Sequence, residues 1–247
     1  MNSINLINNL LEKKNQVELE SYLRSVWDQV WTDDSKLNYA NLRLLKSADK
    51  IKTVSEMGVN FKSKNILDIG CGNGVTLMYL RKFFDITGTG VDISASAVKE
   101  LRDSITDKKL SFYVGDHRDL HMFGTNQFDI VLSFGVLEHF EEYCLAMTEA
   151  RRVLKPSGQI VLIQPHLLSF GVVQEYYLRA VKRWKFGKQK NFSLFRYRSL
   201  LRQAGFKDIR YLTKSPYQDM KLTKIMDSIG KIVLPFWGHY LYLIAKK

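Results

Sequence analysis

Three glycines and one acidic residue stand where the chain begins to alternate apolar runs with helical patterns. Residues 66–74 read Ile-Leu-Asp-Ile-Gly-Cys-Gly-Asn-Gly, so Gly70, Gly72 and Gly74 follow a short apolar strand. Glycine lets the backbone adopt positive φ and approach a ligand closely. The spacing is G-x-G-x-G, whereas nicotinamide dinucleotide folds use G-x-G-x-x-G. Asp68 would repel a pyrophosphate but can pair with an ammonium group.

Two more carboxylates follow the next two apolar runs. Asp92, with Ile93 beside it, can accept hydrogen bonds from both hydroxyls of a ribose. Ser94 already supplies a cap for the helix that follows, so capping does not require Asp92. Asp116 could accept a hydrogen bond from an adenine amino group, and His117 is its neighbour in the loop. The spacing therefore predicts a site for a nucleoside that carries an ammonium group.

The elements that must position these residues can be read from apolar runs and helical spacing. Near-continuously apolar strands separated by helices predict a parallel sheet that is covered on both faces. The strands are expected at residues 66–69, 86–91, 110–114, 128–133, 159–164, 205–213 and 236–245. The helices are expected at residues 75–84, 94–105, 143–154 and 218–231, and a turn at 155–158 leads into the fifth strand.

The two ends of this pattern suggest added helical parts. Residues 1–60 have apolar residues at helical spacing and are expected to form an N-terminal helical segment. Residues 61–247 are then the second domain, with a basic helical cap at about 167–204 inserted after the fifth strand.

Taken together, the motifs resemble the class I S-adenosylmethionine-dependent methyltransferases, specifically the type 11 group. The resemblance covers roughly residues 64–164 and, more weakly, 205–247. It implies an α/β fold: a Rossmann-like, doubly wound, seven-stranded sheet with the last strand antiparallel. It also implies S-adenosylmethionine as cofactor, with Asp68 and the three glycines around its methionine part. Asp92 would bind the ribose and Asp116 the adenine, and we include Ile93, His117 and Ser133 in the same site.

The segment at residues 128–140 limits the chemistry within that family. Enzymes that methylate exocyclic amines of nucleobases or glutamine usually carry Asn/Asp-Pro-Pro-Tyr here, whereas this chain has Ser133-Phe134-Gly135-Val136. Neither cysteine follows a proline, as a cytosine-C5 enzyme would need. Metal-assisted relatives place a second Glu where this chain has Gly135, so we expect no metal.

Methyl transfer is an in-line displacement on a sulfonium, so the protein mainly has to align the reactants. A hydroxyl acceptor benefits from a nearby base. His139 and His166 are the candidates, because both follow strands at the edge where open α/β sheets build their sites. We expect transfer to a small-molecule, lipid or glycan acceptor, at oxygen. The alternatives are an RNA methyltransferase and a non-catalytic cofactor-binding scaffold, and the intact acidic and glycine motifs argue against the scaffold.

The positive charge is concentrated in one stretch. The chain carries a formal charge of +12, and residues 176–214 contain twelve basic residues against one acidic residue, Asp208. Aromatic residues are interleaved with them. This pattern is compatible with a solvated helix face over the active site, with an anionic membrane surface or with a soluble anionic acceptor, and it suits RNA less well. The start of the chain lacks the apolar run of a secretory signal, and two cysteines offer no disulfide framework. We expect a cytoplasmic protein, with peripheral contact at the inner face of the membrane as an open alternative.

Overall fold

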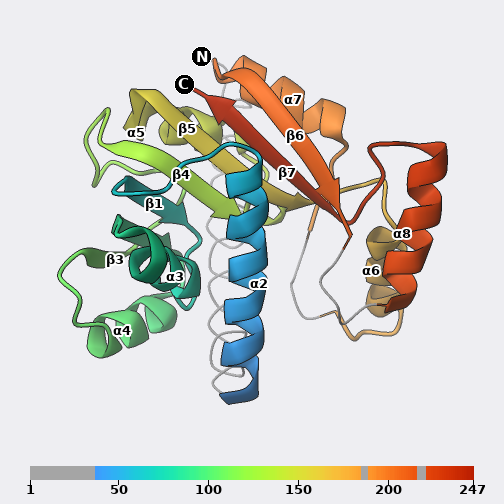
Figure 1. Ribbon diagram of the computed structural model, residues 1–247, viewed down its shortest axis with the longest axis horizontal. Coiled ribbons are helices and arrows are strands. Elements are labelled where there is room, and N and C mark those ends of the chain that lie inside the picture. The colour runs from blue at the N-terminus through green and yellow to red at the C-terminus, as the bar shows by residue number, and fades with distance from the viewer. Residues whose placement is uncertain (1–36, 185–188, 216–220) are drawn as a thin grey trace, which may run out of the picture.

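The computed structural model describes residues 37–184, 189–215 and 221–247, and within them the chain forms a seven-stranded sheet. The strand order is β3-β2-β1-β4-β5-β7-β6 (Figure 1). The strands are β1 (Asn65–Ile69), β2 (Thr87–Asp92), β3 (Leu110–Val114), β4 (Phe128–Phe134), β5 (Leu154–Pro165), β6 (Lys207–Lys214) and β7 (Tyr240–Lys246). Strands β1 to β5 pair in parallel, and β7 runs antiparallel to both β5 and β6. The expected fold class is confirmed.

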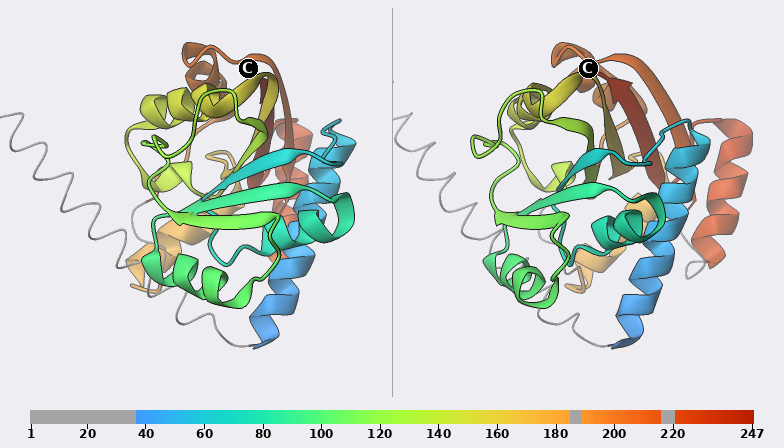
Figure 2. Two further views of the ribbon diagram at one scale, coloured as in Figure 1. Left: turned by 90° about the vertical axis from the view of Figure 1, so that its left-hand side faces the viewer. Right: turned by 60° about the vertical axis from the view of Figure 1, so that its left-hand side comes forward.

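Helices cover both faces of the sheet, as the apolar strands require. The helices are α2 (Leu37–Glu56), α3 (Val75–Phe84), α4 (Ala95–Ser104), α5 (Tyr143–Val153), α6 (Phe170–Ala180), α7 (Leu194–Gln203) and α8 (Lys221–Val233). Buried side chains of α5 and α7 form one core with the sheet, and those of α2, α3 and α4 form the other. In Figure 2, left, α5 and α2 lie on opposite sides of the strands. None of the helices in the described ranges is long and apolar enough to cross a membrane.

The strand order reverses between β1 and β4. Ligands of open α/β sheets bind outside the carboxyl ends of the strands at such a reversal, because the connections leave in opposite directions and open a crevice. The glycine loop follows β1 at this point, and a short 3-10 helix, η1 (Leu137–His139), follows β4. The glycine loop and the segment after β4 therefore meet at one edge of the sheet.

Most expected elements agree with the structure within a few residues. Strand β5 is longer than expected: it begins at Leu154, and a register shift against β4 absorbs the segment 155–158 that we expected to be a turn. Strand β7 begins at Tyr240 rather than at residue 236. The part of the expected N-terminal helical segment that precedes residue 37 lies outside the described residues.

The segment expected to form the basic cap divides between two places. Leu194, Tyr197 and Leu201 of α7 are buried in the core beside α5, so α7 belongs to the helix layer on the sheet. Helix α6 instead contacts α8, away from that layer (Figure 1). Asp227 of α8 accepts a hydrogen bond from Phe170 N at the start of α6, which joins the two helices.

Candidate active site

A pocket opens at the strand reversal, beyond the carboxyl ends of β1, β2, β3 and β4. Its lining combines backbone from the glycine loop, carboxylates from the strand ends and aromatic rings from the segment after β4. The lining residues are Ile69, Gly70, Val91, Asp92, Ile93, Gly115, Asp116, His117, Phe134, Gly135, Val136, His139 and Phe140. Six of the expected site residues line it: Gly70, Asp92, Ile93, Asp116, His117 and His139.

The glycine loop is shaped by its contact with the segment after β4. Gly70 has φ 71°, and a Cβ at this position would lie 2.3 Å from Val136 Cγ2, so only glycine fits without displacement. The N–H groups of Gly70 and Cys71 both donate to Val91 O, at 2.7 and 3.0 Å. These bonds hold the loop against the end of β2. The glycine loop therefore fits a ligand that approaches the backbone closely.

Asp92 ties the glycine loop to the next loop. Its Oδ2 accepts from Gly72 N at 2.8 Å, and its Oδ1 accepts from Ser94 N at 2.9 Å. Ser94 in turn caps α4, because its Oγ accepts from Ala97 N. Asp92 is buried and lines the pocket, and a carboxylate has about four acceptor positions, so it is suited to hold hydroxyl groups there.

Asp116 is held from the other side of the pocket. Its two oxygens receive a bidentate pair of hydrogen bonds from Arg118, with Nη2 2.6 Å from Oδ2. Burial alone would raise the pKa of Asp116, but the bonds from Arg118 and the charge of His117 lower it overall. Arg118 also bonds Glu142 and lies over the ring of Phe140. The carboxylate is therefore ionised and fixed in place.

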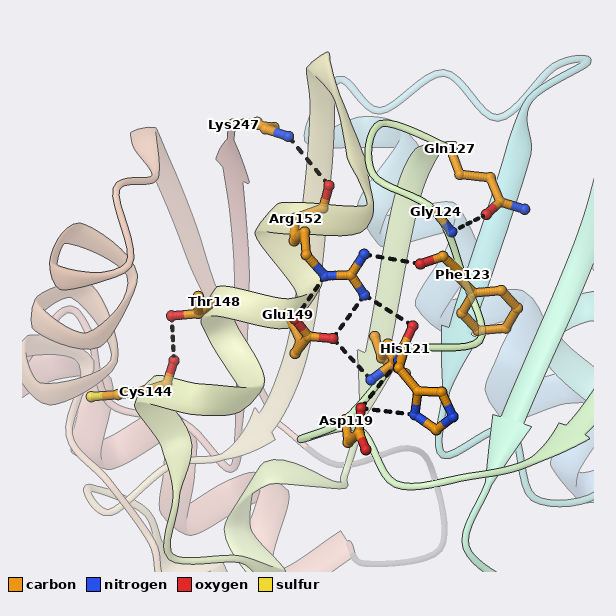
Figure 3. A network of polar contacts seen from close by, with 11 residues as sticks. Asp119, His121, Phe123, Gly124, Gln127, Cys144, Thr148, Glu149, Arg152 and Lys247 are labelled. Atoms are coloured by element: carbon orange, nitrogen blue, oxygen red, sulfur yellow. Dashed lines mark hydrogen bonds and ion pairs between the residues drawn. The ribbon is translucent and has the colours of Figure 1, made fainter.

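A second arginine anchors the rest of the loop after β3 (Figure 3). Arg152 of α5 donates to Phe123 O and to Leu120 O, both at 2.9 Å. It is itself held by Glu149, whose Oε2 also accepts from Leu120 N at 2.9 Å. The loop that carries Asp116 is thus attached to α5 at two carbonyls.

A second pocket adjoins the first and shares Gly135 and His139 with it. Its wall includes α6, which turns Val172, Glu175 and Leu178 inward. The remaining lining residues are Lys50, Glu138, Ile163, Pro165, Ser169, Gly171, Gln174, Trp184, Gln189, Asn191, His239 and Tyr240. This pocket has the size and mixed character of a site for a second reactant.

The two histidines expected as bases have different positions. His139 lines both pockets, and its Nε2 lies 3.9 Å from Glu138 Oε1. His166 is fully buried and lines neither pocket; its Nε2 accepts from Leu194 N at 3.2 Å. The ring of His166 thus holds the start of α7, a position that does not favour its role as a base.

Four other expected residues lie near the pocket without lining it. Asp68 is buried, and burial raises its pKa to about 7, although Lys50 opposes that shift. Gly72 and Gly74 belong to the loop beneath the first pocket, and Gly74 has φ 67° where α3 begins. Ser133 is buried in β4, and its Oγ has no hydrogen-bond partner in the described part of the chain.

Sequence reasoning missed two charged residues of the second pocket. Lys50 belongs to the N-terminal helix, where nothing in its local pattern distinguishes it from other lysines. Glu175 is buried and bonds Arg179, Gln189 and Asn191. The sequence does distinguish Glu175, because it is the one acidic residue in α6.

Comparisons with known proteins agree with the fold and with a methyltransferase domain. Residues 67–162 match the family described as methyltransferase domain. Ajmaline N-methyltransferase of Rauvolfia serpentina is 34% identical over 110 residues, which is 43% of this chain and 37% of that protein. Tocopherol O-methyltransferase of Arabidopsis thaliana is 25% identical over 171 residues, which is 61% of this chain and 49% of that protein. The chain thus spans less than half the length of these relatives.

The fold is also found in solved structures. The crystal structure of an S-adenosylmethionine-dependent methyltransferase from Archaeoglobus fulgidus superposes with a TM-score of 0.60 at 21% identity. That match covers 82% of this chain and 93% of the other. Residues 67–162 thus match a methyltransferase domain, and the strand order and glycine loop around them give the fold of solved S-adenosylmethionine-dependent methyltransferases.

Proposed function

We propose that this chain transfers a methyl group from S-adenosylmethionine to a small-molecule or lipid acceptor. The observation that carries the proposal is the pair of adjoining pockets that share Gly135 and His139. The first pocket has the groups that a nucleoside needs, and the second has room for the acceptor beside it. Two reactants held in this way meet in a fixed geometry, which is the main contribution a protein can make to this reaction.

The cofactor supplies an activated methyl group on its sulfonium, and the residues of the chain bind and orient it. Asp92 would accept from the ribose hydroxyls, and Asp116 with His117 would bound the adenine. Asp68 would face the ammonium group of the methionine part, where Gly70 lets the backbone approach. Ile93 contributes apolar contact to the same pocket.

We propose oxygen as the acceptor atom, because the segment after β4 lacks the element that holds a flat amide or amine. His139 would take the proton of the acceptor, since it lines both pockets. The names of the two relatives divide between N- and O-methylation, so the product decides the atom. Incubation of the full chain with methyl-labelled cofactor and with small-molecule, lipid, glycan and RNA fractions would identify the acceptor. Label only in RNA would overturn the proposed acceptor class.

We also propose a peripheral contact with an anionic membrane at the outer side of α6. The side opposite the second pocket exposes Val173, Tyr176 and Tyr177, and the exposed Lys182 and Arg183 follow the helix. Apolar and aromatic groups beside basic ones are typical of helices that lie at a bilayer surface. These residues suit RNA binding less well, because Tyr197 is buried in the core and cannot stack on a base.

The ribose assignment predicts a loss of affinity in Asp92→Asn. Removing the charge should weaken S-adenosylhomocysteine binding by about 1.5–3 kcal/mol, the range for a hydrogen bond to a charged group. Calorimetry measures the change, and circular dichroism confirms that the variant is folded. The matched control is Asp103→Asn, an exposed residue of α4 paired with Lys99, which should bind like the unaltered chain. Equal affinity in the folded Asp92 variant would contradict the assignment.

The raised pKa of Asp68 predicts a pH dependence of cofactor binding. With a pKa of about 7, the carboxyl is largely neutral at lower pH and becomes a carboxylate as the pH rises through 7. Only the carboxylate attracts an ammonium group, so affinity for S-adenosylhomocysteine should rise between about pH 6 and 8. Calorimetry across this range should show the rise in the unaltered chain and a flat profile in Asp68→Asn. A parallel rise in the variant would assign the titration to another group.

The proposed base predicts a change in turnover without a change in cofactor binding. His139→Ala should lower kcat by about 10²–10⁴, the usual contribution of general base catalysis. Its affinity for S-adenosylhomocysteine should stay within about twofold, since Asp92 and Asp116 are intact. His121→Ala, which removes an exposed imidazole, is the control and should be fully active. Full turnover in His139→Ala would show that alignment alone suffices.

The membrane proposal predicts selective loss of vesicle binding. Each basic residue near an anionic bilayer contributes about 1 kcal/mol, so reversing Lys182 and Arg183 to Glu should weaken sedimentation with anionic vesicles at least about tenfold. The matched control reverses Arg196 and Arg202 on α7, which are also exposed, and should bind normally. Neutral vesicles should bind neither variant. Equal losses in both pairs, or binding to single-stranded RNA alone, would contradict a membrane contact at α6.

A further inference from the structure

Lys50 is held at a fixed place by the packing of α2. Its neighbour Ile51 and Val54 one turn later are buried against α3 and the sheet. Ser47 Oγ lies 3.3 Å from Thr76 Oγ1, at the first turn of α3 just beyond the glycine loop. On the other side, Asp49 forms an ion pair with Lys214 of β6, 2.6 Å apart. The helix is therefore fastened on both sides of Lys50.

The ammonium group of Lys50 lies between the two pockets. Lys50 lines the second pocket, and its Nζ is 5.4 Å from the ring centre of Phe134, which lines the first. Burial lowers the pKa of Lys50, while the charges of Asp68 and Glu138 raise it. Within the described residues, no hydrogen bond or ion pair satisfies its Nζ. A partly buried ammonium without such a partner is costly, so an anionic ligand would be favourable here.

The charge of Lys50 interacts with two buried carboxyl groups, those of Asp68 and Glu138. Burial raises the pKa of Asp68 to about 7 and that of Glu138 to about 8, and Lys50 opposes both shifts. Glu138 Oε2 is buried without a hydrogen-bond partner in the described part of the chain. At neutral pH Glu138 is mostly protonated and cannot neutralise the lysine. Lys50 thus remains available for an anion that arrives with the ligand.

The methionine part of the cofactor is a zwitterion, with an ammonium group and a carboxylate on one carbon. If Asp68 faces the ammonium, the carboxylate needs a cation nearby, and Lys50 is the basic residue whose charge acts most strongly on Asp68. We propose that Lys50 is a cofactor-positioning residue that binds the carboxylate of the methionine part. This inference rests on the proposed function. It makes α2, which precedes the matched methyltransferase domain, a part of the cofactor site.

The test compares two ligands that differ in the amino-acid part alone. S-adenosylhomocysteine carries the carboxylate, whereas 5′-methylthioadenosine lacks the whole amino-acid end. In the full chain with Lys50→Met, calorimetry should show affinity for S-adenosylhomocysteine reduced about 10–100-fold, as for a lost charge-assisted hydrogen bond. Affinity for 5′-methylthioadenosine should not change, which also shows that the variant is folded. Lys50→Arg should recover part of the loss.

The control is Lys52→Met, which removes an exposed lysine of the same helix and should bind both ligands normally. Unchanged S-adenosylhomocysteine affinity in Lys50→Met would overturn the inference, as would an equal loss for both ligands. A raised KM for the acceptor with normal cofactor affinity would also overturn it, by assigning Lys50 to the acceptor. If the unaltered chain binds neither ligand, the proposed function itself fails, and that result is distinct from the others.

Discussion

Asp92 accepts hydrogen bonds from the backbone of two loops, and the shape of the first pocket depends on this one carboxylate. It bonds Gly72 in the loop after β1 and Ser94 at the start of α4. Two loops that belong to different strands are thereby held at a constant separation. The contact also keeps a charged group at the pocket wall, where burial without partners would be costly. The side chain that holds the two loops together thus also lines the first pocket.

The aromatic segment after β4 also shapes the first pocket. Val136 packs against the Cα of Gly70, so the glycine loop and the segment after β4 determine each other's position. Phe140 packs edge-on against His117 with ring centres 4.1 Å apart. These two contacts join residues that line the first pocket but come from different strand ends. Such a site is largely formed before any ligand arrives, which reduces the ordering that binding must oppose.

Between the two pockets lies a small group of buried charges that the fold brings together from three elements. Lys50 comes from α2, Asp68 from β1 and Glu138 from η1. Because burial disfavours charge on each of them, their protonation is sensitive to what occupies the pockets. Helix α6 closes the second pocket from the far side with the buried Glu175. The second pocket is thus lined by charged groups and bounded by a helix whose outer side exposes apolar and aromatic residues.

Basic residues that are close together in the sequence do not have to form one charged surface in the structure. Lys190 pairs with Glu141, Lys214 with Asp49, and Arg179 with Glu175. Others lie on α7 and β6, on a different part of the molecule from α6. The basic residues of this stretch that the structure describes therefore do not gather on one helical cap. Among the described residues, Lys182 and Arg183 are the exposed basic residues that follow the outer side of α6.

The sequence by itself determined the fold class and the part of the site that lies on strand ends. The apolar runs place Gly70 directly after β1, Asp92 at the end of β2 and Asp116 two residues after β3, and parallel strands bring their carboxyl ends to one edge. Such residues are local in the pattern, so no tertiary knowledge is needed to find them. Only the tertiary structure separated His139 from His166, because both follow strands and their difference lies in what packs around them. Lys50 could be found only from the tertiary structure. The packing of α2 places this side chain at the second pocket, and the local sequence around a lysine does not show how its helix packs.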